Sequence, residues 1–181
     1  MSVSKFVLAD PNVCIGCQTC MAACLSKHRR PGDIGRPRLN LVTTLRVSAP
    51  IACHHCDNAP CANVCPVGAL YFDDGRVAIR QDRCIGCFNC EMACPFGAID
   101  IVGKNETRSL EDLRFANKPF PVKCDLCYDR AGGPACVEAC PTKGLRLVDA
   151  DYRDEAMRAK RRAAAFSEVG DSALELNVAL V

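Results

Sequence analysis

The chain has 181 residues, and its 23 Lys and Arg against 21 Asp and Glu give a formal net charge of +2 at pH 7. This length suits one large domain or two small ones, and the near-neutral balance argues against an organised basic face for nucleic acid. Hydrophobic residues make up 49% of the chain, which is enough for a globular core, although aromatic residues are only 6%. No apolar run approaches the ~20 residues that cross a bilayer as a helix.

Cysteine is the unusual component, with sixteen copies in the chain. Such a density in a short secreted chain would indicate a disulfide scaffold. The N-terminal segment instead reaches Asp10 before a long apolar stretch develops, and it has no twin-arginine pair. We therefore expect a cytoplasmic protein in which reduced thiols bind metal, and any attachment to the inner face of a membrane would be through partners.

The cysteines fall into four groups of four, and none is left over. Group one is Cys14, Cys17, Cys20 and Cys24; group two is Cys53, Cys56, Cys61 and Cys65; group three is Cys84, Cys87, Cys90 and Cys94; and group four is Cys124, Cys127, Cys136 and Cys140. Groups one and three have the spacing C-x2-C-x2-C-x3-C, which is the bacterial ferredoxin signature. In groups two and four the loop between the second and third cysteines grows to four and eight residues, with Pro and Gly typical of tight turns.

This spacing indicates iron–sulfur chemistry. Three closely spaced thiolates wrap one corner of a [4Fe–4S] cluster, and the fourth cysteine of such a run ligates the neighbouring cluster. The alternative is zinc, but four-cysteine zinc sites use two separated C-x2-C pairs, whereas three or four ligands crowd each group here. The sequence therefore predicts four [4Fe–4S] clusters that pass single electrons.

The sequence contains no pattern that indicates a reaction of the chain's own. It has neither a G-x-G-x-x-G loop nor a P-loop, and its three histidines have no triad context. His54 and His55 lie beside Cys53, but each group already has four cysteines, so we expect these rings around a cluster or at the surface. The prediction is a non-catalytic electron-transfer subunit.

An internal repeat organises the chain. An apolar strand follows each Cys-Pro pair, in residues 65–72, 94–101 and 140–148, and Asp74-Gly75 predicts a β-hairpin. Only 18 residues separate groups two and three, whereas 28 and 29 residues separate them from groups one and four. We therefore expect an α+β fold with short helices and β-hairpins, in which one two-cluster ferredoxin-like unit is inserted into another.

The predicted domains follow this nesting. Residues 1–48 with 117–150 form the outer ferredoxin-like unit, residues 49–116 form the inserted inner unit, and residues 151–181 form a C-terminal helix and tail. The helix is predicted over 152–166, which is rich in good helix formers. Either this helix packs on the ferredoxin body and the end of the chain is frayed, or the apolar tail docks on a partner, and both interpretations stay open.

The first long gap contains a basic segment at residues 27–38, interrupted by Pro and Gly. We interpret it as a solvated loop that balances the charge of the clusters, and the alternative is a patch that docks a partner. A strand is predicted to follow it over residues 39–47.

Four stretches carry a family resemblance: residues 10–24, SAPIACHHCDNAPCANVCPVGAL, CPFGAI and VKCDLC…GGPACVEACPTKGL. They resemble the four-cluster iron–sulfur subunit of formate hydrogenlyase and formate dehydrogenase complexes, within the electron-transfer subunit family of molybdopterin oxidoreductases. The resemblance runs from about residue 5 to residue 148, with a weaker match in the tail.

The resemblance implies crossed ligation, in which groups one and four share two clusters and groups two and three share the other two. The implied ligand sets are Cys14, Cys17 and Cys20 with Cys140; Cys124, Cys127 and Cys136 with Cys24; Cys53, Cys56 and Cys61 with Cys94; and Cys84, Cys87 and Cys90 with Cys65.

The resemblance also implies partners. Electrons from formate oxidation at a molybdopterin-containing formate dehydrogenase catalytic subunit would pass through the clusters to a hydrogenase or to other iron–sulfur subunits, or back for CO2 reduction. No nucleic acid and no direct membrane span are expected. Two alternatives stay open: an adaptor ferredoxin for another redox enzyme such as carbon monoxide dehydrogenase, and an accessory or maturation protein of formate dehydrogenase.

Overall fold

A computed structural model describes residues 4–29, 35–103 and 119–167 of the chain. The middle of the predicted basic segment, the predicted boundary between inner and outer units at 116–117, and the apolar tail lie outside the described residues. The chain divides into two compact units, residues 1–147 and 148–181.

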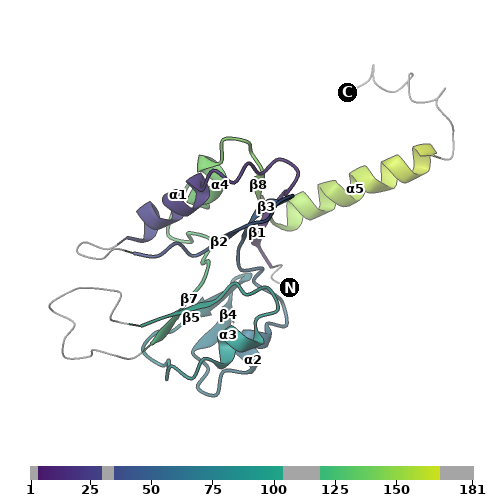
Figure 1. Ribbon diagram of the computed structural model, residues 1–181. Helices are drawn as coiled ribbons and strands as arrows, with labels where there is room; N and C mark the ends of the chain where they lie inside the picture. Colours follow the sequence, from purple (N-terminus) through teal and green to yellow (C-terminus); the bar gives the residue numbers. More distant parts are fainter. Residues whose placement is uncertain (1–3, 30–34, 104–118, 168–181) are drawn as a thin grey trace. The chain divides into compact units, whose positions relative to one another are not determined.

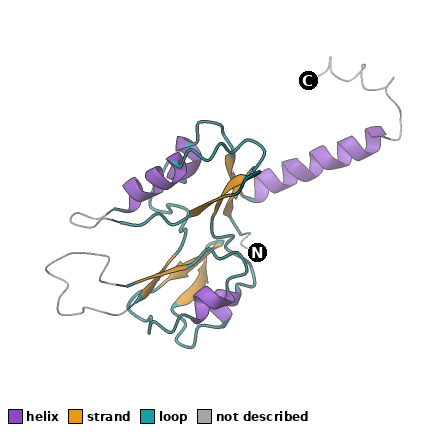
Figure 2. Ribbon diagram, viewed as in Figure 1, coloured by secondary structure: helices purple, strands orange, loops and turns teal. Residues whose placement is uncertain are grey.

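The fold is α+β, as predicted, and its elements are short apart from the last helix (Figures 1 and 2). The strands are β1 (Phe6–Ala9), β2 (Asn40–Thr43), β3 (Ser48–Ile51), β4 (Leu70–Asp73), β5 (Arg76–Ile79), β6 (Asp100–Val102), β7 (Phe120–Val122) and β8 (Leu145–Val148). The helices are α1 (Thr19–His28), α2 (Pro60–Asn63), α3 (Asn89–Ala93), α4 (Ala135–Ala139) and α5 (Ala150–Ser167).

The described strands form four two-stranded sheets, in which β1 pairs with β8, β2 with β3, β4 with β5, and β6 with β7. The β4–β5 hairpin confirms the turn predicted at Asp74-Gly75, and Leu70 lies opposite Ile79 in its register. Asp74 and Gly75 both have positive φ, 42° and 75°, as a two-residue turn that matches the twist of the strands requires.

The prediction of a single strand over residues 39–47 is wrong beyond residue 43. β2 ends at Thr43 and the chain turns back into β3. The side chain of Thr44 explains the turn, because its Oγ1 accepts a hydrogen bond from the backbone N–H of Val47 at 3.0 Å and also donates to the Val47 carbonyl. Such side-chain bonds to the local backbone compete with an extended strand.

The helices that carry cysteines pack in pairs: α1 against α4, and α2 against α3 (Figure 1). Together with the β1–β8 pairing, the α1–α4 contact joins the first and last parts of the 1–147 unit, as the nested arrangement requires. Two buried clusters fill this unit, one around Val7, Leu39 and Leu145, and the other around Leu70 and Val77. Cysteines belong to both, so the predicted ligands are also core residues.

The second unit contains α5, which begins before the predicted helix. The carboxylate of Asp149 accepts a hydrogen bond from the backbone N–H of Tyr152 at 2.9 Å and so caps the first turn. No described helix combines the length and apolar character that a membrane crossing demands.

Candidate metal centres

The loops of groups one and three have the same backbone geometry. Gly16 and Gly86, inside the first C-x2-C pair of each group, have φ of +68° and +71°. The residues just before α1 and α3, Gln18 and Phe88, are also left-handed, with φ of 62° and 64°. Repeated left-handed residues turn backbone N–H groups toward one side of a loop, where they form a concavity suited to a negatively charged group.

Two cavities are lined by cysteines of different groups. Cys14, Cys17 and Cys20 of group one line one cavity together with Cys140 of group four. Cys84, Cys87 and Cys90 of group three line another together with Cys65 of group two. In both cases the three closely spaced cysteines of one group meet the fourth cysteine of a different group.

The remaining cysteines are brought together in the same crossed manner. Burial raises the pKa of the Cys61 thiol to about 11, and the nearby Cys53 and Cys94 add to the shift. Burial likewise raises the pKa of the Cys136 thiol to about 12, and Cys124, Cys24 and Cys127 contribute further. Group two thus lies beside Cys94, and group four beside Cys24.

Backbone N–H groups donate hydrogen bonds to the sulfur atoms of these cysteines at two recurring sequence offsets. The N–H two residues after the cysteine donates to Sγ of Cys53, Cys84 and Cys124 at 3.3–3.4 Å. The N–H four residues after it donates to Sγ of Cys65 and Cys94, at 3.2 and 3.4 Å. Hydrogen bonds of this kind to ligand sulfur stabilise the electron-rich form of an iron–sulfur cluster.

The cysteine chemistry fits four [4Fe–4S] clusters. All sixteen thiols are free of disulfide bonds, and most are buried or half-buried. Several buried thiols have raised pKa values, so their deprotonated form is costly in the protein alone, whereas a coordinated metal deprotonates a thiol outright. A buried set of four thiolates therefore suits a cationic core.

Polar side chains surround the group-four cysteines. The guanidinium of Arg38 donates to the carboxylate of Asp125 at 2.5 Å, and its backbone N–H donates to Cys24 Sγ at 3.2 Å. Nε2 of His28 lies 3.4 Å from the same carboxylate and 3.8 Å from Cys127 Sγ. The two ends of the predicted basic segment thus contact cysteines: Arg38 contacts Cys24 of group one, and His28 contacts Cys127 of group four. These contacts are more specific than charge balance in a solvated loop.

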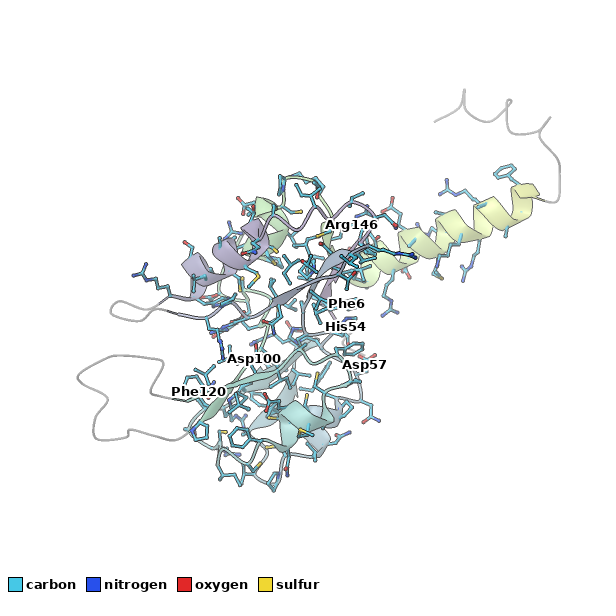
Figure 3. All side chains as sticks on the ribbon, in the orientation of Figure 1. Phe6, His54, Asp57, Asp100, Phe120 and Arg146 are labelled. Atoms are coloured by element: carbon cyan, nitrogen blue, oxygen red, sulfur yellow. The ribbon has the colours of Figure 1, made fainter. Side chains whose placement is uncertain are left out.

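The two adjacent histidines of group two have different environments. The ring of His54 stacks on that of Phe6 at a centroid distance of 5.0 Å (Figure 3) and, on its other face, on that of Phe96 at 3.9 Å. The ring of His55 is fully buried, and its Nδ1 accepts a hydrogen bond from the backbone N–H of Val77 at 2.9 Å. Burial lowers the pKa of His55 to about 2, so the ring is neutral and its proton lies on Nε2.

Three polar residues of these sites were not predicted from the sequence. Arg38 contacts Cys24, Asp125 forms an ion pair with Arg38, and Lys123 is buried. The position of Lys123 and Asp125, on either side of the first cysteine of group four, could have indicated that they belong to the site. Nothing in the local pattern joined Arg38 to Asp125, which lie 87 residues apart along the chain.

Comparison with known proteins agrees with this chemistry. Residues 46–150 match a family described as "4Fe-4S dicluster domain", and residues 13–70 match a second family with the same description. The chain is 40% identical to formate hydrogenlyase subunit 2 of Escherichia coli strain K12, over 95% of each chain. It is 39% identical to hydrogenase-4 component A of the same strain, over 96% of this chain and 98% of the relative. It is also 40% identical to the electron transport protein HydN of that strain, over 91% of this chain and 99% of the relative.

Proposed function

Since the chain belongs to the 4Fe-4S dicluster family and is an iron–sulfur electron-transfer protein with four [4Fe–4S] clusters, we propose that it connects a molybdopterin formate dehydrogenase subunit to a hydrogenase module. It carries out no reaction of its own, as the relatives' names as subunits and electron transport proteins indicate. Each cluster, when bound, accepts and passes on one electron. The protein's part is to hold the clusters in place and to set their potentials.

The proposal includes the crossed ligand sets. Cys14, Cys17 and Cys20 with Cys140 hold cluster A, and Cys124, Cys127 and Cys136 with Cys24 hold cluster B. Cys53, Cys56 and Cys61 with Cys94 hold cluster C, and Cys84, Cys87 and Cys90 with Cys65 hold cluster D. The cavities lined by the A and D cysteines support these sets, as do the electrostatic neighbours of Cys61 and Cys136.

The observation that carries the proposal is that neighbouring sets share a helix or a buried cluster. Cys20 of set A and Cys24 of set B share α1, and Cys53 of set C lies in the same buried cluster as Cys124 of set B. Cys90 of set D shares a second buried cluster with Cys61 of set C. Cysteines of sets A, B and C thus share one buried cluster and cysteines of sets C and D share the other, which supports a path A–B–C–D between two partners.

The choice of partners rests on the relatives. Formate hydrogenlyase subunit 2 is named as part of a formate-linked hydrogen-producing complex, and hydrogenase-4 component A as part of a hydrogenase. Both align with nearly the whole of this chain. Formate oxidation coupled to hydrogen production, or its reverse, is the function that unites the two names.

A second candidate is an adaptor or accessory role. The relative HydN is named only as an electron transport protein, at the same identity and over 99% of its length. A chain of this family therefore need not be a fixed subunit, and it could serve a different redox enzyme or assist formate dehydrogenase during assembly.

An anaerobic co-purification from the native cell separates these candidates. We expect the tagged chain to retain, in equimolar amounts, a molybdenum- or tungsten-containing formate dehydrogenase subunit and a hydrogenase subunit. Formate should then reduce the clusters of the complex. A chain with both Cys53→Ser and Cys56→Ser should keep both partners but lose hydrogen production, because loss of set C interrupts the path. Substoichiometric recovery of the dehydrogenase without a hydrogenase would support the accessory role and contradict the proposal.

A further inference from the structure

Lys123 is a buried lysine beside the first cysteine of group four. Only 3% of its surface is exposed. Its Nζ donates to the backbone carbonyl of Cys124 at 3.0 Å and to the backbone carbonyl of Val77. Among the described residues no carboxylate forms an ion pair with it. Lysine is almost never buried in this way unless its charge is paired.

The two carbonyls place the ammonium between two sets of cysteines. Cys124 belongs to the buried cluster that contains Cys53 and Cys136, whereas the side chain of Val77 belongs to the one that contains Cys61. The hydrogen bonds of Lys123 therefore join the backbone of a set B cysteine to a strand whose Val77 side chain packs in the buried cluster of Cys61 of set C and Cys90 of set D. Of these two, Cys61 is the one on which the charge of Lys123 acts.

The electrostatic environment agrees with this position. The ammonium of Lys123 lies close enough to the side chains of both Cys61 and Cys124 to act on them electrostatically. One ammonium thus acts on cysteines of two groups that lie more than sixty residues apart in the sequence.

A nearby anion would stabilise this charge, because an isolated ammonium in a protein interior is strongly unfavourable even after the surroundings relax. A [4Fe–4S] core with four thiolates has a net charge of about −2 when oxidised and about −3 when it has accepted one electron. A nearby fixed cation stabilises the reduced form more than the oxidised form, because the attraction grows with the negative charge.

We propose that Lys123 is the common counter-charge of clusters B and C, and that it raises the reduction potentials of these two clusters above those they would have beside a neutral residue. This proposal rests on the proposed four-cluster relay. Its consequence is that an electron moves more readily onto clusters B and C from clusters A and D, while the driving force between B and C, which share the same cation, stays small.

Lys123 also has a packing role from which the electrostatic role must be separated. Val77 is held on both sides, because its N–H donates to His55 and its carbonyl accepts from Lys123. Loss of the lysine could therefore disturb the β4–β5 hairpin as well as remove a charge. Lys123→Met keeps the apolar stem and removes the charge, Lys123→Gln keeps one donor for the Val77 carbonyl, and Lys123→Arg keeps both charge and donors.

The test uses the full chain, purified anaerobically, with iron counted before each measurement. Midpoint potentials of the clusters are determined by electron paramagnetic resonance during a redox titration. The control is Lys5→Met, the same change at an exposed lysine, where water screens the lost charge. Signals of clusters B and C are assigned with Cys24→Ser and Cys94→Ser.

In Lys123→Met and Lys123→Gln we expect two potentials, those of B and C, to become more negative, while the other two change less. Lys123→Arg should restore both, and Lys5→Met should change none. Unchanged potentials in neutral variants with full iron would overturn the proposal, as would an equal shift of all four. Loss of iron from both neutral variants would mean that Lys123 holds the hairpin instead, and would also overturn it. A wild-type chain without four clusters would refute the proposed function itself, and iron analysis distinguishes that result from the others.

Discussion

Cys17 and Cys87 occupy the same position in two copies of one motif, and they are the two cysteines of the sixteen whose side chains are exposed. Each is the second cysteine of a C-I-G-C run, and each lines a cavity with a fourth cysteine from a different group. Their exposure places sets A and D at the surface, whereas every group-four cysteine but Cys140 is buried. Electrons are therefore expected to enter and leave the protein through clusters A and D.

The isoleucines of the two C-I-G-C runs provide the test. Ile15 and Ile85 are 67% and 53% exposed and also line the cavities of sets A and D, so the iron content and the cluster potentials of each variant are measured before its rates are compared. Ile15→Glu should slow electron exchange with one partner and Ile85→Glu with the other, because each places a charge where a partner must approach. Stopped-flow reduction by each partner measures both rates. Leu8→Glu, at another exposed apolar residue, is the control, and equal slowing by all three changes would contradict the assignment.

Metal content is the most direct prediction of the cysteine chemistry. Protein prepared anaerobically should contain about sixteen iron and about sixteen acid-labile sulfide per chain, as four [4Fe–4S] clusters require. Colorimetric iron and sulfide analysis measures both. If careful reconstitution yields stoichiometric zinc and little iron, the iron–sulfur interpretation is wrong for those groups.

Much of the site followed from local spacing, since the ferredoxin runs, the Asp74-Gly75 hairpin and the C-terminal helix each depend on residues close together in the sequence. The contacts that sequence did not predict are those with no local pattern. The Arg38–Asp125 ion pair and the bond from Lys123 to Val77 span 87 and 46 residues. Burial of a lysine is also invisible in composition, because most lysines are exposed. The short β2–β3 hairpin depended on one threonine side chain, which a strand pattern does not reveal.

Gly86 is expected to be intolerant of a side chain. A Cβ at this position would lie 2.8 Å from the side chain of Pro119, and the backbone φ is +71°. Gly86→Ala should therefore cost about 1–2 kcal/mol for the left-handed backbone and about 1–3 kcal/mol more for overpacking. Gly133→Ala is the matched control, because Gly133 has φ of +72° but its added Cβ would meet no atom within 4 Å. Thermal unfolding and iron loss should both be worse for Gly86→Ala, and equal effects would show that backbone strain alone matters.

Deletion of residues 167–181 should leave all four clusters in place. No cysteine lies beyond Cys140, and residues 148–181 form a compact unit separate from the one that contains the cysteines. The removed stretch ends in the apolar run ALELNVALV, so binding to a partner subunit should weaken. Iron analysis and anaerobic co-purification measure the two effects. A truncated chain that loses iron on its own would identify the tail as part of the ferredoxin fold.

The last prediction concerns the closure of the outer unit by Cys140. This cysteine lines a cavity with Cys14, Cys17 and Cys20, although more than one hundred residues separate them in the sequence. Cys140→Ser should therefore perturb cluster A rather than the cluster of Cys124, Cys127 and Cys136. Because metal binding is coupled to folding, this variant should also lose the α1–α4 contact more readily than the α2–α3 contact.

Comparison with other serine variants makes this test specific. Cys14→Ser should alter the same paramagnetic signal as Cys140→Ser, because both remove a ligand of cluster A. Cys136→Ser should alter a different signal, even though Cys136 belongs to the same sequence group as Cys140. Spectra of the three variants at equal iron content, followed by an anaerobic crystal structure of the wild-type protein, measure the assignment. If Cys140→Ser and Cys136→Ser alter one signal together, the fourth cysteine serves its own group and the crossed arrangement is refuted, while electron transfer through four clusters stands.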